Sequence, residues 1–476
     1  MSTLIPGIGV AGVRGDPTST DVASVEFDSR NVGPGSLFCC VPGELTDGHL
    51  YAAEAVDRGS TSLLCDHFLD LDVTQVRVAP GQIRPAMAAV SAAFYGHPTS
   101  ALTMVGVTGT NGKTTVTQLL RSILEGSGRS TGAIGTLEGV RTTPEAPVLQ
   151  RLLAGFREDG LQAVAMEVSS HALTQHRVDG IVFDVAAFTN LSRDHLDHHR
   201  TMEGYFAAKA RLFEEHRARL CVINVDDPWG RRLADGLASH RVVRVRRSDA
   251  TDVRLSVGTS AFSWRGRRVT LPLSGAFNVD NALLAATVAS SLGVDEDRIA
   301  GGLDSVPPVP GRMELVSAGL PFAVVVDYAH TPAGLDRALA AARELAGPAR
   351  VICMFGCGGD RDRGKRPEMG AAAARWADII VLTSDNPRSE DPVAIIGEIR
   401  SGIGDTVDPV VEPDRAQAIR AAVGRARSGD VVLLAGKGHE TTQVTGDLAV
   451  PFDDRLEAGR ALAERFPGAG RGDVDG

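Results

Sequence analysis

The sequence predicts an α/β protein of three domains with mostly parallel sheets, and three observations lead to this prediction. Short apolar runs alternate with segments of helical periodicity over most of the chain, which is typical of parallel strands covered by helices. The length of 476 residues exceeds what one hydrophobic core usually supports. Breaks at Pro98 and at the proline-rich stretch 307–311 divide the chain into domains at 1–98, 99–310 and 311–467, with a disordered tail at 468–476.

The first domain is expected to be a small mixed α/β unit, with a helix at 50–58 and a strand at 61–65. A glycine-rich turn at 108–115 follows the first strand of the central domain, so this domain is expected to be an ATPase of the phosphate-loop type, with a hairpin at 253–273 and a helix at 278–292. The third domain is expected to be Rossmann-like. Strands of the last two domains are expected at 102–107, 163–168, 182–188, 220–225, 323–326, 351–355, 379–383 and 431–434.

The composition restricts the partners. The net charge of −10, from 49 basic and 59 acidic residues, argues against a general nucleic-acid partner. The start of the chain lacks the pattern of a signal peptide, and no long apolar run follows, so we expect no membrane insertion and a cytoplasmic location. The six cysteines show neither zinc nor disulfide spacing, and we expect them to be buried, reduced core residues.

A glycine-rich turn after the strand at 102–107 predicts a phosphate site. Gly109 and Gly112 leave room for a phosphate beside the N-terminus of the next helix, where backbone N–H groups and the helix dipole favour anions. Lys113 would reach the outer phosphates, and Thr114 a bound Mg²⁺. Val107 occupies the first glycine position of the strict motif, so the stretch is a variant phosphate loop; the alternative is a plain strand-to-helix turn.

Glu167 ends an apolar strand, as expected of an acid that holds Mg²⁺ opposite a phosphate loop. The alternative is an acid that caps the following helix. In the stretch 194–199, neighbouring aspartates and histidines point in different directions, so one histidine near a Mg²⁺-triphosphate is favoured over a dedicated zinc site.

Lys209 lies in a predicted helix at 203–215 among apolar residues. By itself this pattern is typical of a surface lysine whose stem covers apolar side chains.

Two polar loops of the third domain offer arginines to an anionic ligand. One is the stretch 359–366. In the other, Asp385 and Asn386 could hold an ammonium group, while Arg388 could clamp a carboxylate bidentately. The second loop also reads as an ordinary helix entry with Asp391 as N-cap, and both interpretations can hold together.

Taken together, these residues resemble the Mur ligases of peptidoglycan synthesis, and within them the MurE type, which adds the third amino acid to UDP-N-acetylmuramoyl-L-alanyl-D-glutamate. The resemblance covers almost the whole chain. It rests on ordered stretches that include TGTNGKTT (108–115), EVSSH (167–171), TNLSRDHLDHH (189–199), DYAHTP (327–332), GCGGDRDRGKRP (356–367), DNPR (385–388) and GKGHE (436–440).

The resemblance implies site residues, position by position. The ATP and Mg²⁺ positions are Gly109, Thr110, Asn111, Gly112, Lys113, Thr114, Thr115, Glu167, His195, Asn281, Arg312 and Asp327. Lys209 matches a lysine that CO₂ converts into a carbamate, a carboxylate-like ligand for a second Mg²⁺. Ser29, with the stretches 28–30 and 46–49, matches uridine-binding positions, and the muramoyl-peptide positions are Thr142, Thr143, Ser169, Gln175 and Arg177. The incoming amino acid would be held by Arg361, Asp385, Asn386, Pro387, Arg388, Gly436 and Glu440.

The DNPR stretch is similar to that of the meso-diaminopimelate-adding enzymes, because an arginine suits the carboxylate that L-lysine lacks. The resemblance therefore implies three small-molecule substrates: ATP, the UDP-N-acetylmuramoyl dipeptide and meso-diaminopimelate. A monomer is expected. One departure is Arg141, where some members carry asparagine. The alternatives are a lysine-adding enzyme of the same type, a folylpolyglutamate synthetase, and an ATP-binding switch or scaffold without ligase activity.

Overall fold

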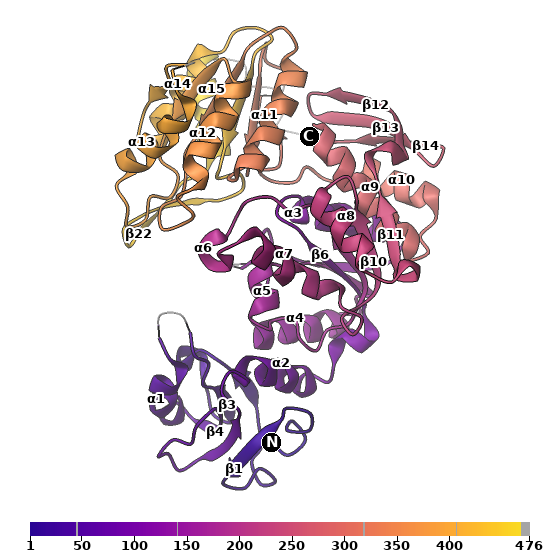
Figure 1. The fold of residues 1–476 in the computed structure, drawn as a ribbon, viewed down its shortest axis with the longest axis vertical. Coiled ribbons are helices and arrows are strands. Elements are labelled where there is room, and N and C mark those ends of the chain that lie inside the picture. Colours follow the sequence, from indigo (N-terminus) through magenta and orange to yellow (C-terminus); the bar gives the residue numbers. More distant parts are fainter. Residues whose placement is uncertain (44–45, 140, 318, 406, 468–476) are drawn as a thin grey trace. The chain divides into compact units, whose positions relative to one another are not determined.

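The computed structural model describes residues 1–43, 46–139, 141–317, 319–405 and 407–467 (Figure 1). The disordered tail expected at 468–476 lies outside this part. Backbone packing divides the chain into two units, each described by itself. Unit 1 comprises Met1–Thr108, Gly128–Ala187 and Ala208–Cys221, and unit 2 comprises Gly109–Ser127, Phe188–Ala207 and Val222–Gly476. The three expected domain boundaries stay a prediction.

The N-terminal part of unit 1 is a five-stranded sheet in the order β1-β5-β4-β3-β2. Neighbouring strands are parallel except for β1, which pairs antiparallel with β5. The expected helix at 50–58 begins as a 3₁₀ helix, η2 (Gly48–Tyr51), and continues as α1 (Ala52–Asp57). The other elements are β1 (Val10–Arg14), β2 (Ser24–Glu26), β3 (Ser36–Cys39), β4 (Ser60–Cys65), β5 (Thr74–Val78) and α2 (Ile83–Phe94).

The middle of the chain forms a six-stranded sheet in the order β11-β10-β9-β6-β8-β7. The four expected strands are present as β6 (Thr103–Thr108), β8 (Ala163–Glu167), β9 (Phe183–Phe188) and β10 (Ala218–Asn224). β7 (Thr131–Ile134) and β11 (Val242–Val245) were not expected from the sequence. The helices of this part are α3 (Lys113–Gly126), α4 (Ala146–Glu158), α5 (Ser170–Thr174), α6 (Leu196–His199), α7 (Met202–Ala210) and α8 (Pro228–Asp235).

Two details of the middle part differ from the sequence prediction. The helix expected at 203–215 is shorter: α7 ends at Ala210, and the chain tightens into a 3₁₀ helix, η4 (Arg211–Phe213), that buries Leu212 and Phe213. The hairpin expected at 253–273 is a three-stranded antiparallel sheet of β12 (Ala250–Ser256), β13 (Thr259–Trp264) and β14 (Arg267–Leu271). It is followed by α9 (Ala276–Ser291) and α10 (Glu296–Asp304).

The last part of unit 2 is a six-stranded sheet in the order β15-β16-β20-β17-β18-β19, parallel except for β15. Val325, Cys353 and Phe355 face a core with α11, α12 and α13. Val324, Ile352 and Met354 face a second core with α14 and α15. The alternation along each buried strand therefore places helices on both faces, as expected of an α/β fold.

The elements of this part begin with the strands β15 (Glu314–Leu315), β16 (Ala323–Asp327), β17 (Val351–Phe355), β18 (Ile379–Leu382), β19 (Val410–Val411) and β20 (Val431–Ala435). The helices are α11 (Pro332–Ala346), α12 (Lys365–Trp376), α13 (Pro392–Ile403), α14 (Arg415–Arg425) and α15 (Asp454–Arg465), and a hairpin joins β21 (Thr442–Thr445) and β22 (Leu448–Pro451).

All six cysteines are free and buried, as predicted. Over the described ranges, no helix combines the length and the apolar character needed to cross a bilayer.

Candidate active site

The phosphate loop lies between β6 and α3 and leaves no space for side chains at its two glycines. A Cβ atom on Gly109 would lie 1.8 Å from Oγ1 of Thr189, and one on Gly112 would lie 2.4 Å from Oδ1 of Asn281. Both glycines have positive φ, +146° and +88°, which other residues rarely adopt. Asn190 fixes the loop, because its carbonyl and side-chain oxygens accept the N–H groups of residues 110 and 111 at 2.8 and 3.1 Å.

A cavity of about 350 Å³ opens beside this loop in unit 2. Arg312 donates from Nη2 to Oγ1 of Thr114 at 3.0 Å, and its guanidinium group lies 4.5 Å from the ring centre of Tyr328. Asp327 is buried, and burial raises its pKa although Arg312 opposes the shift. The loop and Asn281 complete the lining. This cavity therefore brings together the predicted positions Asn111, Gly112, Thr115, Asn281, Arg312 and Asp327.

Two observations indicate that cationic donors in and beside this cavity could accept an anionic ligand. Among the described residues, the buried Nε of Arg312 has no hydrogen-bond partner, so a donor is available at the cavity wall. Lys113 folds its Nζ back onto the carbonyl oxygens of Gly109 and Thr110 at 3.0 Å each. A phosphate would offer this ammonium group a better acceptor, because charge-assisted hydrogen bonds are the stronger ones.

A second cavity of unit 2, of about 330 Å³, collects the charged loops of the third domain. Arg388 is half-buried and donates from Nη1 to the carbonyl of Gly359 at 2.7 Å. Burial and the nearby Arg361 both lower the pKa of Arg388. Two guanidinium groups that share a cavity favour an anionic ligand. The lining includes the predicted positions Arg361, Asp385, Asn386, Arg388, Gly436 and Glu440.

A lysine that was not predicted from the sequence lies close to the two acidic residues of this cavity. Lys437 is fully buried, and its Nζ lies 3.1 Å from Oε2 of Glu440 and 3.9 Å from Oδ1 of Asp385. Burial raises the pKa of Asp385, whereas Lys437 and the amide of Asn386 lower that of Glu440 despite burial. Lys437 belongs to the GKGHE stretch, so this motif could have identified Lys437 as a candidate site residue.

The backbone around the cavity leaves no room for larger residues. A Cβ atom on Gly359 would lie 1.9 Å from the carbonyl oxygen of Pro387, and Gly359 N–H donates to the carbonyl of Asn386 at 2.9 Å. Asp391 caps α13 by accepting from Val393 N–H, as the helix-entry interpretation predicts.

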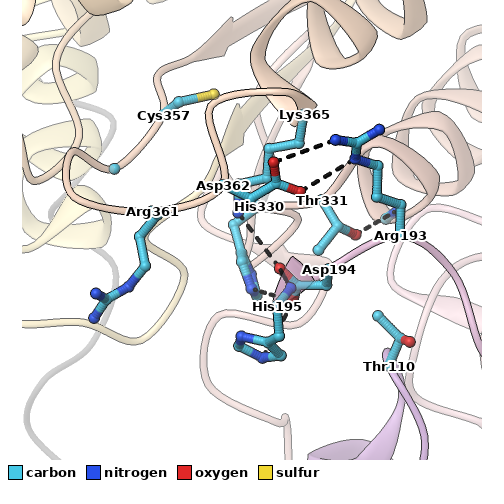
Figure 2. A network of polar contacts seen from close by, with 12 residues as sticks. Thr110, Arg193, Asp194, His195, His330, Thr331, Cys357, Arg361, Asp362 and Lys365 are labelled. Atoms are coloured by element: carbon cyan, nitrogen blue, oxygen red, sulfur yellow. Dashed lines mark hydrogen bonds and ion pairs between the residues drawn. The ribbon is translucent and has the colours of Figure 1, made fainter. Parts of the chain in front are cut away.

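A network of polar contacts in unit 2 connects the stretch 189–199 with the loops after β16 and β17 (Figure 2). Arg193 donates from Nε to Oδ2 of Asp362 at 3.1 Å. Asp194 is buried and lies 3.4 to 3.7 Å from ring nitrogens of His195 and His330 and from Nζ of Lys365. The hydrogen bond with His330 and the nearby side chains of His195 and Lys365 outweigh burial and hold the pKa of Asp194 well below its usual value.

In unit 1, the predicted muramoyl-peptide positions gather around Glu167. Thr143 donates to the backbone oxygen of Glu167 at 2.9 Å and accepts from Ser169 N–H at 3.0 Å. Arg177 donates to the carbonyl of Thr143 at 2.9 Å and to Oε1 of Gln175 at 2.6 Å. Thr142 lies 3.0 Å from the hydroxyl of Thr136, which also reaches the carboxylate of Glu167 at 3.3 Å.

The helix-capping alternative for Glu167 is wrong. Its carboxylate accepts from Thr136 N–H at 2.9 Å. Ser169, not Glu167, caps α5, because its Oγ accepts from Ala172 N–H.

Ser29 lines a separate cavity of unit 1, of about 600 Å³. Glu145 lies on its wall and pairs with Arg84 at 3.2 Å, with Arg141 at 2.7 Å and with Arg177 at 2.9 Å. The departure at Arg141 thus adds a third cation around one carboxylate. Neither Arg84 nor Glu145 belongs to a stretch that the sequence singled out.

Lys209 is only 1% exposed, so the interpretation as a surface lysine is wrong. It belongs to unit 1 with Glu167, whereas His195 and the phosphate loop belong to unit 2. A magnesium site that draws on all of them stays a prediction.

Three family models match the chain in succession. The first describes the Mur ligase family catalytic domain at residues 21–99, the second the Mur ligase middle domain at 107–289, and the third the Mur ligase glutamate ligase domain at 311–438.

Curated relatives match over nearly the full length. Proteins named UDP-N-acetylmuramoyl-L-alanyl-D-glutamate--2,6-diaminopimelate ligase from Geobacillus kaustophilus and Listeria monocytogenes are 45% and 41% identical, each over 94% of this chain, and the matches cover 96% and 95% of those proteins. A solved structure of a ligase with the same name is 31% identical, with a TM-score of 0.62 over 93% of this chain and 95% of the other. MurF ligase from Thermotoga maritima in complex with ADP, at 19% identity, shares the fold with a TM-score of 0.67 over 95% of this chain and 100% of that chain.

Proposed function

Because this chain belongs to the Mur ligase family, we propose that it is an ATP-dependent ligase of peptidoglycan precursor synthesis. It joins meso-2,6-diaminopimelate to the D-Glu γ-carboxylate of UDP-N-acetylmuramoyl-L-Ala-D-Glu, the reaction that names its relatives. We expect this reaction to take place in the cytoplasm, where ATP is supplied, and we expect the chain to act as a monomer.

The proposal that diaminopimelate is the amino-acid substrate rests on the cavity around Arg361 and Arg388. Diaminopimelate has two carboxylates and two amines, so it presents both signs of charge at each end. The two arginines provide cations for carboxylates, and Asp385 and Glu440 provide anions for an ammonium group on the same cavity wall. L-Lysine would leave one guanidinium group without an anion, which is costly in a half-buried site.

The reaction proceeds in two steps. The γ-carboxylate of D-Glu attacks the γ-phosphorus of ATP, so that ADP leaves and an acyl phosphate forms. The amine of diaminopimelate, after losing a proton, then attacks the acyl carbon and expels inorganic phosphate to form the amide. Lys113 and Arg312 offset the negative charge that develops on the transferred phosphoryl group, and Asn281 and Asp327 complete the nucleotide cavity.

Thr114, Glu167 and His195, with Lys209 as its carbamate, are the residues proposed to hold Mg²⁺. The oxygen donors of Thr114, Glu167 and the carbamate fit this ion, because oxygen atoms are its preferred protein ligands and Glu167 is buried at a strand end, whereas His195 offers a nitrogen atom. The near-complete burial of Lys209 also suits a carbamate kept from hydrolysis. When bound, Mg²⁺ neutralises phosphate charge. Thr136 orients the Glu167 carboxylate from both its N–H and its hydroxyl group.

Three alternatives compete with this proposal. A lysine-adding ligase of the same type would have no use for Arg388. A folylpolyglutamate synthetase shares the fold, since such an enzyme from Mycobacterium tuberculosis matches 79% of this chain with a TM-score of 0.60. That enzyme would not need the first domain and its cavity around Ser29. An ATP-binding switch would leave the charged cavity of the third domain without a role.

The test is ADP release with ATP, Mg²⁺ and the UDP-N-acetylmuramoyl dipeptide, comparing meso-diaminopimelate with L-lysine, with bicarbonate present to form the carbamate. We expect turnover with diaminopimelate and a product whose mass is that of the tripeptide. A preference for lysine would overturn the role of Arg388 but keep the ligase. ATP turnover that ignores both amino acids and the dipeptide would favour the switch.

A further inference from the structure

Two histidines and an aspartate cluster in the first domain, and only His49 among them belongs to a stretch, 46–49, that the resemblance assigns to uridine binding. His49, Asp66 and His67 each bring one ligand atom to within 4.8 Å of the others. Over the ranges that the structure describes, this is the one group of three such side chains that meets this criterion. All three belong to unit 1, so their arrangement depends on a single packed body.

His49 is held in the orientation of a metal ligand. It lies on η2, where the carboxylate of Asp47 accepts His49 N–H at 3.0 Å and lies 2.6 Å from the ring Nδ1. A proton on Nδ1 that is donated to this carboxylate leaves a lone pair on Nε2. A carboxylate behind the imidazole fixes the tautomer and makes the free nitrogen more basic, as in most histidine-metal sites. The His49 side chain is only 5% exposed and already fixed by packing, so metal binding would require no further loss of its conformational freedom.

Asp66 follows β4 and places Oδ1 3.2 Å from Nε2 of His49. With the proton on Nδ1, both facing atoms are acceptors, and they repel each other unless a cation lies between them. Asp66 N–H also approaches Nε2, at 3.4 Å, which is a long bond for a buried imidazole. Ligands of a tetrahedral Zn²⁺ about 2.0 Å from the metal lie roughly 3.3 Å apart, close to the separation seen here.

His67 completes the group on the solvent side. Its Nδ1 lies 2.6 Å from Oδ1 of Asp66, and its ring stacks on that of His49 with 4.3 Å between the centroids. The side chain is 59% exposed, so it can leave the stack and turn toward an ion that enters from solvent. If an ion bound all three residues, the contact between His67 and Asp66 would be lost. Each of these two side chains would form a coordinate bond to the ion in its place.

We propose that His49, Asp66 and His67 form a binding site for Zn²⁺ or a chemically similar transition-metal ion, distinct from the Mg²⁺ of the ligase reaction. Two imidazoles and one carboxylate favour such ions over Mg²⁺, which prefers oxygen ligands. The fourth position would be taken by water. Because Gly48 and Tyr51 of η2 line the cavity around Ser29, a bound ion would also stiffen one wall of that cavity.

The experiment uses the full chain without a polyhistidine tag, stripped with a chelator and kept in excess Mg²⁺ so that oxygen-rich sites are filled. Co²⁺ is titrated and followed by its visible absorption, and Zn²⁺ is then added to displace it. We expect one ion per chain. Asp66→Asn and His67→Asn are each expected to weaken Zn²⁺ binding by at least about tenfold, and to abolish any rise in melting temperature that Zn²⁺ causes.

His216→Asn is the matched control. His216 also belongs to unit 1, is 70% exposed and lies 3.5 Å from a carboxylate oxygen of Glu214, but has no second histidine in a comparable group among the described residues. Its replacement is expected to leave Zn²⁺ affinity unchanged. The proposal is overturned if the stripped chain binds no Zn²⁺ in excess Mg²⁺, or if both site variants bind it as tightly as the unchanged chain. These outcomes do not depend on ligase activity, so they are independent of the proposed function.

Discussion

The two cavities of unit 2, proposed to bind the nucleotide and the amino acid, are built by different means. The nucleotide cavity is shaped by backbone: Gly109 and Gly112 approach Thr189 and Asn281 so closely that no Cβ atom fits. The amino-acid cavity is shaped by charged side chains: Lys437 balances two acids, and Arg388 and Arg361 line the same cavity. In the proposed function, the first arrangement would recognise a phosphate chain by shape and N–H direction, whereas the second would recognise the number and position of ligand charges.

The difference has a structural cost. A backbone cradle needs only glycines and a helix N-terminus, so it depends on local geometry. A cluster of buried charges must be paired by further buried groups, because an uncompensated buried charge is strongly destabilising. Arg415 shows this: it is fully buried, pairs with Asp454 at 2.6 Å and donates to the carbonyl oxygens of Ser384 and Ala435, which precede Asp385 and Gly436.

The largest effect is expected in the nucleotide cavity. Lys113→Ala should lower kcat about 10³- to 10⁵-fold, because a cation on the transferred phosphoryl group is removed. The measurement is steady-state ADP release at saturating substrates. Arg121→Ala is the control, since Arg121 lies on the same helix, has a side chain that is 43% exposed and pairs with Glu125. A loss below tenfold for Lys113→Ala would mean that phosphoryl transfer does not occur at this loop.

The next effect is on stability and concerns the support of the amino-acid cavity. Arg415→Met should lower the free energy of unfolding by about 3–5 kcal/mol, because Asp454 is left buried and unpaired. Arg415→Met combined with Asp454→Leu should recover much of this loss, since the pair is then replaced by apolar side chains. Urea unfolding measures both variants. A double variant no more stable than the single one would show that the hydrogen bonds to the two carbonyls dominate.

A smaller effect is expected on amino-acid selectivity. Arg388→Ala should lower kcat/KM for meso-diaminopimelate about 100-fold, or about 2.7 kcal/mol, while leaving any activity with L-lysine unchanged. Arg400→Ala, an exposed arginine that pairs with Asp408, serves as the control. Equal losses with both amino acids would assign Arg388 to the stability of the cavity and remove it from selectivity.

The smallest effect is expected for the pH dependence of stability at Asp194. Its pKa in the folded state is depressed by His330, His195 and Lys365, so it lies below the unfolded value of about 3.9. The resulting stabilisation is present at neutral pH and is lost as the pH falls through the folded pKa. The stability difference between the unchanged chain and Asp194→Asn should therefore close on acidification, as measured by urea unfolding at several pH values. A difference that persists at low pH would contradict this.

The strands and the phosphate loop followed from local pattern. The eight buried strands expected in the last two domains are present, with ends within a few residues of the predicted ones. A short, continuous apolar run that is followed by a turn is typical of a buried strand, so local pattern was sufficient to predict them. Short or partly exposed strands such as β7 and β19 escaped notice, since their pairing depends on neighbours that are distant in sequence.

The sequence by itself determined the α/β class, the position of the variant phosphate loop and the choice of Arg388 as a candidate binding residue. Each of these depends on residues that are adjacent in the chain. The tertiary structure alone decided which charges meet. Local pattern made Lys209 a surface residue, yet it is buried, and Lys437 gave no sign that it would neutralise two acids. Nor did the sequence pair His49 with Asp66. Burial and charge pairing depend on contacts between residues that are far apart in the chain, and only the packing of the folded protein determines these contacts.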